Sequence, residues 1–225
     1  MKIVAIIPAR KGSKSIKNKN ITIYRKKPLI YHSIKTALSI KLLDRVIVST
    51  NSKEYRNIAK KFGAEAPFLR PNSISRDNSL DREFIIHAYN YLKFQEGYET
   101  DLFVLLRPTT PNREKHVVIK GIKFFLKNIK KVDSMRSLSL FNQPPEKFFY
   151  KKGKILKGYF DKTLKNEYHS YPRQKFRTAY LPNGYIDILK PKFFLKNKKK
   201  LFGKRILGYL TKETTDIDTK NDLLK

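Results

Sequence analysis

The stretch KIVAIIPARKGSKSIKNKNI (residues 2–21) joins a continuous apolar run to a strongly basic loop. Its first part, KIVAIIP (2–8), is rich in β-branched residues and ends at Pro8, which is typical of a strand buried on both faces of a parallel sheet. The loop then carries five closely spaced cations, which are Arg10, Lys11, Lys14, Lys17 and Lys19. Because these charges repel one another, we expect an anion among them: a nucleic acid, a membrane surface or a small polyphosphate.

Further along the chain, apolar runs alternate with segments of helical periodicity. The pattern predicts strands at 44–50, 101–106, 183–189 and 205–211, a further candidate strand at 132–141, and helices at 28–40, 52–62, 81–94 and 113–128. This alternation is typical of an α/β domain with a mostly parallel sheet. Ligands bind beyond the carboxyl ends of the strands in such sheets, where the basic loop, STNSK (49–53) and RPTTPNR (107–113) are expected to lie.

Residues 144–182 interrupt this rhythm, because they are rich in aromatic residues and turn signals and lack a helical period. We expect them to form a hairpin-like arm inserted in a single domain that spans residues 1–225. Such an arm cannot bury both of its faces alone, so contact with a second subunit is expected.

Composition narrows the class of protein. The 225 residues carry a formal net charge of +31, with 40% apolar residues and no cysteine. The absence of cysteine excludes disulfides and thiolate metal sites and suits the cytoplasm. No run approaches the roughly 20 apolar residues of a membrane span. The charge invites a nucleic-acid interpretation, but the lysines are spread over the whole length, which favours solvated surfaces instead.

The basic loop and a pair of aspartates are the two candidate sites. Gly12 and Ser13 lie between cations, so the loop can wrap backbone N–H groups around phosphates, although it matches neither G-x-x-x-x-G-K-[ST] nor G-x-G-x-x-G. Asp216 and Asp218 are two residues apart on an extended segment and project to the same side, where they could share Mg²⁺. The alternative for Asp218 is that it caps the following turn.

Several ordered motifs together resemble one family. IIPARKGSKSIKNKNI (6–21), FLRPNSISRD (68–77), LLRPTTPNR (105–113), RQ (173–174), NG (183–184) and DIDTKNDL (216–223) are similar to the signatures of the cytidylyltransferases that activate sialic acid and related nonulosonic acids. The resemblance runs from residue 3 to about residue 223. It implies a Rossmann-like three-layer α/β/α sandwich with a protruding dimerisation arm, like that of nucleotide-diphospho-sugar transferases.

The resemblance also implies an activity: CTP and an acidic keto-acid sugar would give a CMP-sugar and pyrophosphate, for surface glycans or flagellin. It implies a homodimer with no specific nucleic acid and no membrane insertion. Catalysis would rest on Arg10, Lys19, Asp216 and Asp218, with Mg²⁺ on the two aspartates. The nucleotide would contact Ala9, Arg10, Gly12, Ser13, Lys14, Lys19, Asn20, Arg70, Asp77, Arg107, Pro108 and Thr109. The sugar would contact Lys147, Arg173, Gln174 and Asn183, with the arm acting in trans.

Four residues depart from the family pattern. Ser15 replaces a usual glycine, Arg107 a glutamine, Asp81 a small hydroxyl residue, and Leu181 a frequent arginine. These departures leave the identity of the sugar open, with a Kdo-type synthetase as the alternative. Two readings outside this chemistry also stay open at this point: a basic nucleic-acid-binding protein, and a family member that binds nucleotide without turnover.

Overall fold

The apolar run at the start of the chain forms strand β1 (Ile3–Pro8), in which Ile3 to Ile7 are all buried. A computed structural model describes residues 1–164, 166–197 and 199–224. β1 pairs in parallel with β4 (Arg45–Ser49) on one side and with β5 (Leu102–Leu105) on the other. All three strands therefore end at the same edge of the sheet.

The main sheet has six strands in the order β10-β6-β9-β5-β1-β4. β6 (Ser134–Phe141) and β10 (Ile206–Leu210) are parallel neighbours, whereas β9 (Ala179–Leu189) is antiparallel to both β5 and β6. The expected mostly parallel sheet is therefore present, and in the part of the chain that the structure describes β9 is the one antiparallel strand of this main sheet.

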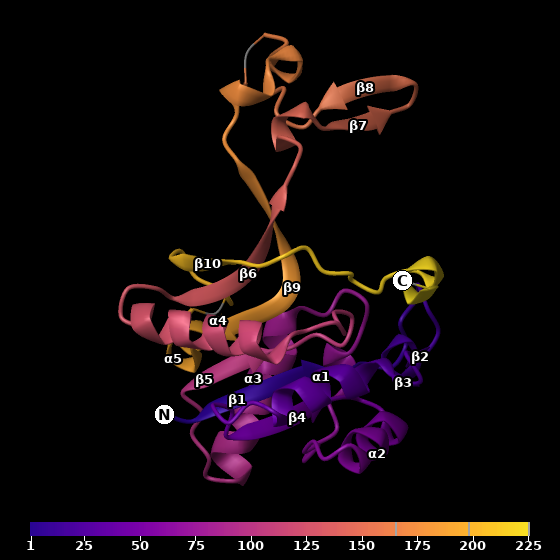
Figure 1. Cartoon of the computed structure of the whole chain (residues 1–225), viewed down its shortest axis with the longest axis vertical. Helices are drawn as coiled ribbons and strands as arrows, with labels where there is room; N and C mark the ends of the chain where they lie inside the picture. The colour runs from indigo at the N-terminus through magenta and orange to yellow at the C-terminus, as the bar shows by residue number, and fades with distance from the viewer. Residues whose placement is uncertain (165, 198, 225) are drawn as a thin grey trace.

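Helices cover both faces of the sheet, which makes three layers. The helices α1 (Leu29–Leu38), α2 (Lys53–Lys61) and α4 (Lys115–Asn128) bury apolar residues in one core cluster. The helices α3 (Asp81–Gln95) and α5 (Pro191–Lys196) bury apolar residues in a second core cluster. The predicted α/β/α sandwich is confirmed, and its termini lie apart (Figure 1).

Two ordered segments were not predicted. The strands β2 (Ile23–Tyr24) and β3 (Lys27–Pro28) form a small hairpin after the basic loop. Its turn holds Arg25 and Lys26 at positive φ, a conformation that usually selects glycine or asparagine. α5 is the second such segment, and its six residues are too few to give a clear helical period.

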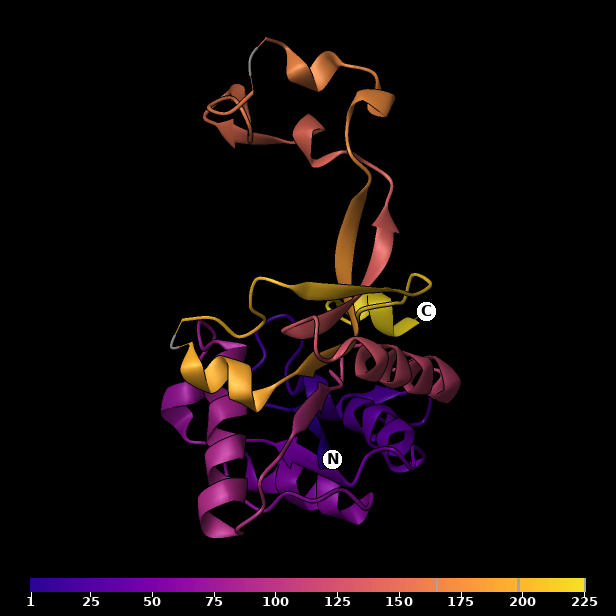
Figure 2. The same cartoon turned by 90° about the vertical axis from the view of Figure 1, so that its left-hand side faces the viewer.

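An arm projects from one end of the sheet (Figures 1 and 2). Beyond the sheet, the ends of β6 and β9 continue as a two-stranded ribbon, in which Phe141 pairs with Ala179. Between them lies a head with the hairpin of β7 (Phe149–Lys152) and β8 (Ile155–Gly158). Residues 179–182, expected in the irregular arm, belong to β9 instead, because they pair with β6 despite Pro182.

Ser52 is the N-cap of α2 and gives a test of local stability. Its Oγ accepts a hydrogen bond from the Tyr55 N–H at 3.3 Å, which satisfies one of the free donors of the first turn. We expect Ser52→Ala to lower the free energy of unfolding by about 1 kcal/mol. Chemical denaturation measures the loss, with Ser73→Ala, at an exposed position, as the control. Equal stability of the two variants would contradict the capping role.

Candidate functional site

A cavity of about 210 Å³ opens at the carboxyl ends of β1 and β5. Segments from four parts of the chain line it: the basic loop, the stretch before α3, the start of α3, and the residues after β5. Eight predicted nucleotide-binding residues are in its lining, namely Arg10, Ser13, Lys19, Asn20, Arg70, Arg107, Pro108 and Thr109. The topology thus brings together motifs that are up to about a hundred residues apart in sequence.

The basic loop is held in place by its own backbone. The Ala9 N–H donates to the Ser49 carbonyl at 2.9 Å, which extends the pairing of β1 with β4 by one residue. The amide of Asn20 donates to the Arg10 carbonyl at 3.0 Å, closing the loop on itself. Gly12 has φ of 93° and open space beside its Cα, so a ligand can approach its backbone closely. Ala9 and Gly12 therefore shape the loop from outside the cavity lining.

Asp77 lies between two cations of this loop. Its carboxylate is 2.8 Å from both the Arg10 and the Lys14 side chains, and these cations hold the pKa of Asp77 below its usual value, Lys14 more than Arg10. Neither Lys14 nor Asp77 lines the cavity. Asp77, which is predicted to contact nucleotide, occupies a position where two cations converge on an anion.

The two aspartates near the C-terminus reach the same loop. After β10 the chain crosses the body of the molecule and ends beside the basic loop (Figure 1). The Asp218 carboxylate is 2.7 Å from Lys19 Nζ, and the Ile217 N–H donates to the Thr109 carbonyl at 2.7 Å. Ile217 is fully buried between the two exposed aspartates, as alternation on an extended segment requires.

The turn after Asp218 is held by the side chain of Asp222. The carboxylate of Asp222 accepts hydrogen bonds from the backbone N–H groups of Asp218 and Thr219 at 3.2 and 2.8 Å. Asp218 is therefore free of the capping role that was its alternative explanation, and its charge faces Lys19.

The electrostatics of Asp216 fit a cation-binding role. The surrounding protein raises the pKa of Asp216 mainly by burial, although part of the residue is exposed to solvent, and the nearby charge of Asp218 raises it further. A divalent cation between the two carboxylates would relieve this repulsion. No cluster of three or more potential protein ligands exists in residues 1–164, 166–197 and 199–224. A bound Mg²⁺ would therefore draw its other ligands from water and substrate phosphates, which suits that ion.

Two arginines shape the floor of the cavity. Arg70 is buried, donates to the Ser49 carbonyl at 2.6 Å and lies over the ring of Phe84; its burial lowers its pKa to about 10. Arg107 forms a two-pronged ion pair with Asp81 at the start of α3. Two of the departures from the family pattern are thus partners of each other.

Three of the four predicted sugar-binding residues, Lys147, Arg173 and Gln174, belong to the arm and lie away from this cavity. Arg173 and Gln174 are exposed and line a separate cavity on the arm, of about 420 Å³, and Lys147 lies near the base of the arm head without lining it. Asn183, on β9, donates to Thr211 Oγ1 at 2.7 Å. Within one chain the arm points away from the body, so Arg173 and Gln174 are not brought to the nucleotide cavity, whereas Gly184, the neighbour of Asn183, packs close to Arg107 of its lining (Figure 2).

Sequence reasoning missed Asp187, which lies on β9 behind the cavity and is 2% exposed. One carboxylate oxygen is 3.3 Å from Arg136 Nε, and the other is 3.7 Å from Arg107 and has no hydrogen-bond partner among the described residues. Burial raises its pKa above the usual range. An acidic residue within the apolar run NGYIDIL was the available signal.

Comparisons with known proteins show which family the sequence resembles and which fold it shares. A family model described as Cytidylyltransferase matches residues 4–86. The N-acylneuraminate cytidylyltransferase of Escherichia coli is 35% identical over 98% of the chain and 50% of its own length. The CMP-N,N'-diacetyllegionaminic acid synthase of Legionella pneumophila is 32% identical over 99% of the chain and 93% of its own length. The chain thus spans about half the length of the N-acylneuraminate cytidylyltransferases that it matches.

Among solved structures, a CMP:2-keto-3-deoxy-manno-octonic acid synthetase complexed with CTP superposes with a TM-score of 0.72. The match covers 100% of the chain and 96% of that structure at 17% identity, which establishes a shared fold.

Proposed function

The chain belongs to the CMP-sialic acid synthetase family, and from this premise we propose that it transfers CMP from CTP to the anomeric hydroxyl of a sialic-acid-like nonulosonic acid. The products are a CMP-sugar and pyrophosphate. Relatives named for N-acylneuraminate, N,N'-diacetyllegionaminic acid and pseudaminic acid support this class of acceptor. A CMP-sugar of this kind would serve surface glycan synthesis, and the cysteine-free chain suits the cytoplasm.

One observation carries the proposal: Lys19 at the cavity and Asp218, 199 residues later, meet at 2.7 Å. A cationic loop for phosphates and a carboxylate pair thereby share one site. A protein that binds nucleic acid through the same cations gains nothing from a carboxylate placed among them, because it would repel the phosphate backbone. The nucleic-acid alternative is for that reason not favoured.

The residues divide the reaction between them. Arg10 and Lys19, which line the cavity, would bind the triphosphate together with Lys14. Arg10 and Lys14 would exchange their ion pairs with Asp77 for contacts with phosphate oxygens. The hydroxyl oxygen of the sugar attacks the α-phosphorus of CTP. The bond between the α-phosphorus and the oxygen that bridges it to the β-phosphorus then breaks, and pyrophosphate leaves. The hydroxyl proton passes to a carboxylate of the aspartate pair. The fixed cations stabilise the charge that develops on the leaving pyrophosphate.

Asp216 and Asp218 would hold Mg²⁺, as their two adjacent carboxylates allow. The ion would supply charge neutralisation at the phosphate oxygens. Lys19 forms an ion pair with Asp218, and we propose that the nucleotide and the ion compete for these two groups, the phosphate for Lys19 and the ion for Asp218.

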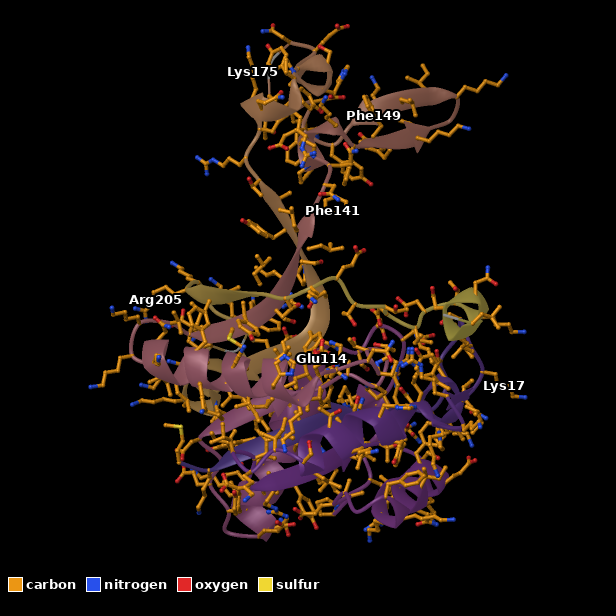
Figure 3. All side chains as sticks on the ribbon, viewed as in Figure 1. Lys17, Glu114, Phe141, Phe149, Lys175 and Arg205 are labelled. Carbon is orange, nitrogen blue, oxygen red and sulfur yellow. The ribbon has the colours of Figure 1, made fainter. Side chains whose placement is uncertain are left out.

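We propose further that two chains form a homodimer through their arms, each arm reaching the sugar site of the partner. The arm head exposes several large apolar side chains: Phe148, Phe149, Tyr150, Ile155, Leu156 and Tyr159. Figure 3 shows Phe149 and Lys175 far from the body of the molecule, to which Glu114 belongs. Arg173 and Gln174 on the arm can reach a sugar in a site of this kind only if that site belongs to another subunit.

A mixing experiment tests whether the arm acts in trans. Arg173→Ala should raise the KM for the sugar by at least about tenfold, because a charged contact from the arm is lost. Asp216→Asn should inactivate the catalytic site on the body of the same chain. Dimers that exchange between these two variants should regain about a quarter of the wild-type rate, because half of the dimers carry one intact composite site of two. The steady-state rate of the mixture, compared with the sum of the separate variants, provides the measurement. A mixture no faster than that sum would show that each chain uses its own arm or none.

The reaction itself is tested by incubating the protein with CTP, Mg²⁺ and a panel of keto-acid sugars and following pyrophosphate release. The panel includes an eight-carbon Kdo-type sugar as the alternative acceptor. Release that depends on a nonulosonic acid supports the proposal, whereas release with the eight-carbon sugar alone would favour the alternative.

A further inference from the structure

A small apolar cluster, separate from the two main cores, joins four segments of the chain. Its members are Ile16 of the basic loop, Tyr24 of β2, Leu29 at the start of α1 and Ile217 near the C-terminus, and each is at most 5% exposed. We call it the anchor cluster. Burial of apolar side chains from separate segments holds those segments together.

The anchor cluster is tied to the nucleotide cavity through Ile16 and Tyr24. The Ile16 carbonyl accepts a hydrogen bond from the Lys19 N–H at 3.1 Å, in the turn that brings Lys19 to the cavity lining. The Asn112 side chain, after β5, donates to the Tyr24 hydroxyl at 2.9 Å. The position of Lys19 therefore depends on the packing of Ile16.

The segment that carries the aspartate pair has few other attachments. Residues 212–218 follow β10 and form neither helix nor strand. Among the described residues, Ile217 is the one member of this segment whose N–H donates to a backbone carbonyl, that of Thr109 at 2.7 Å. The ion pair of Asp218 with Lys19 is a further contact. A segment with so few contacts opens easily when one of them is lost.

Burial of Ile217 determines where the two carboxylates project. Successive side chains of an extended segment point to opposite sides, so Asp216 and Asp218 both lie on the side away from the anchor cluster. There Asp218 meets Lys19, and Asp216 lies within the electrostatic influence of Lys19 and Arg107, both of which line the cavity.

With the proposed function as the premise, we propose that Ile217 is a positioning residue, which through the anchor cluster holds Asp216 and Asp218 at the basic loop while nucleotide binds. The ion pair with Lys19 cannot do this, because phosphate would compete for the lysine. An apolar contact competes with neither phosphate nor Mg²⁺, so it persists when both are bound.

The test compares Ile217→Ala with Ile122→Ala. Both changes remove the same atoms from a fully buried isoleucine, but Ile122 lies on α4 in a main core. Calorimetric titration with Mg²⁺, in the presence of CTP and without sugar, measures the Kd of the ion without turnover. Ile217→Ala should raise this Kd at least about tenfold, because it releases the residues that hold the ligands. Ile122→Ala should lower the temperature of unfolding at least as much and leave the Kd unchanged.

Two further variants separate positioning from a local defect at residue 217. Ile217→Val keeps most of the buried side chain and should retain the Kd of the parent. Ile16→Ala changes the opposite side of the anchor cluster and should also raise the Kd for Mg²⁺. In the double variant Ile16→Ala/Ile217→Ala the rise should be smaller than the product of the two single rises, because both changes release the same contact.

Each outcome decides a different point. An unchanged Kd in Ile217→Ala, or equal rises in Ile217→Ala and Ile122→Ala, would overturn the positioning role while leaving the reaction intact. An unchanged Kd in Ile16→Ala would show that the anchor cluster does not join the loop to the carboxylates, and would overturn the proposal as well. No pyrophosphate release by the parent with any sugar would instead overturn the proposed function on which the positioning role rests.

Discussion

Asp216→Asn should lower kcat by at least about a hundredfold, because it removes one of the two carboxylates that would hold Mg²⁺ and take the proton of the attacking hydroxyl. The matched control is Glu213→Gln, which removes an exposed negative charge three residues earlier in the same segment. Steady-state rates at saturating CTP and Mg²⁺ measure the difference. A loss for Asp216→Asn no larger than that for Glu213→Gln would contradict a catalytic role.

The same variant should be at least as stable as the parent at neutral pH. The pKa of Asp216 is raised in the folded chain, chiefly by burial, so its neutral form is the one that the fold favours. Its contribution to stability is fully present below the pKa of the unfolded chain and is lost as the pH rises through the higher pKa of the folded chain. Asparagine stays neutral, so thermal unfolding at pH 7 should occur at an equal or higher temperature. A marked fall in that temperature would show that lost activity reflects lost structure.

Lys19→Met should lower kcat/KM for CTP by about a hundredfold or more, because it removes a cation that the fold keeps at the cavity. The Lys19 side chain is only 13% exposed, and its partner Asp218 is 66% exposed, so water can solvate Asp218 after the change. Stability should therefore fall little. Lys17→Met serves as the control, because Lys17 is exposed at the outer edge of the same loop (Figure 3).

The two lysine variants change the net charge equally, so any difference between them reports position rather than overall charge. Similar losses in kcat/KM would show that the loop acts only through its general positive potential. Repeating both measurements at raised salt distinguishes a direct contact from a general positive potential. Salt screens a general potential strongly, whereas it screens a direct contact at a partly buried site much less.

Hydrophobic periodicity predicted most of the sheet and its helices, because these elements bury one face or two and so need regular apolar spacing. The predicted strand at 2–8 and the predicted helix at 81–94 agree with β1 and α3 to within a residue at each end. The turn of the β2–β3 hairpin gave no such signal, since Arg25 and Lys26 are not residues that favour positive φ. The extent of β9 was also hidden, because Pro182 interrupts a strand whose pairing with β6 depends on the distant chain.

The candidate site was predictable to a similar degree. The basic loop and the aspartate pair stood out by residue type, and the family resemblance joined them before the structure placed Lys19 beside Asp218. The ion pair of Asp81 with Arg107 was not predictable from either residue alone, because each looked like an isolated departure. Asp187 was missed because the burial of an acidic side chain depends on which strands flank it, and β5 and β6 do so only in the folded chain.

Phosphorus NMR of a reaction with CTP, Mg²⁺ and a diacetamido nonulosonic acid tests the central claim most directly. The proposed transfer predicts that the three CTP signals decay together while a phosphodiester signal of the CMP-sugar and a pyrophosphate signal grow. The pyrophosphate signal should have twice the intensity of the phosphodiester signal, because the two products form in equal amounts and pyrophosphate holds two equivalent phosphorus atoms. Omission of the sugar should leave CTP intact. Free CMP or CDP as the product, or the same rate with and without sugar, would contradict transfer of CMP to an acceptor.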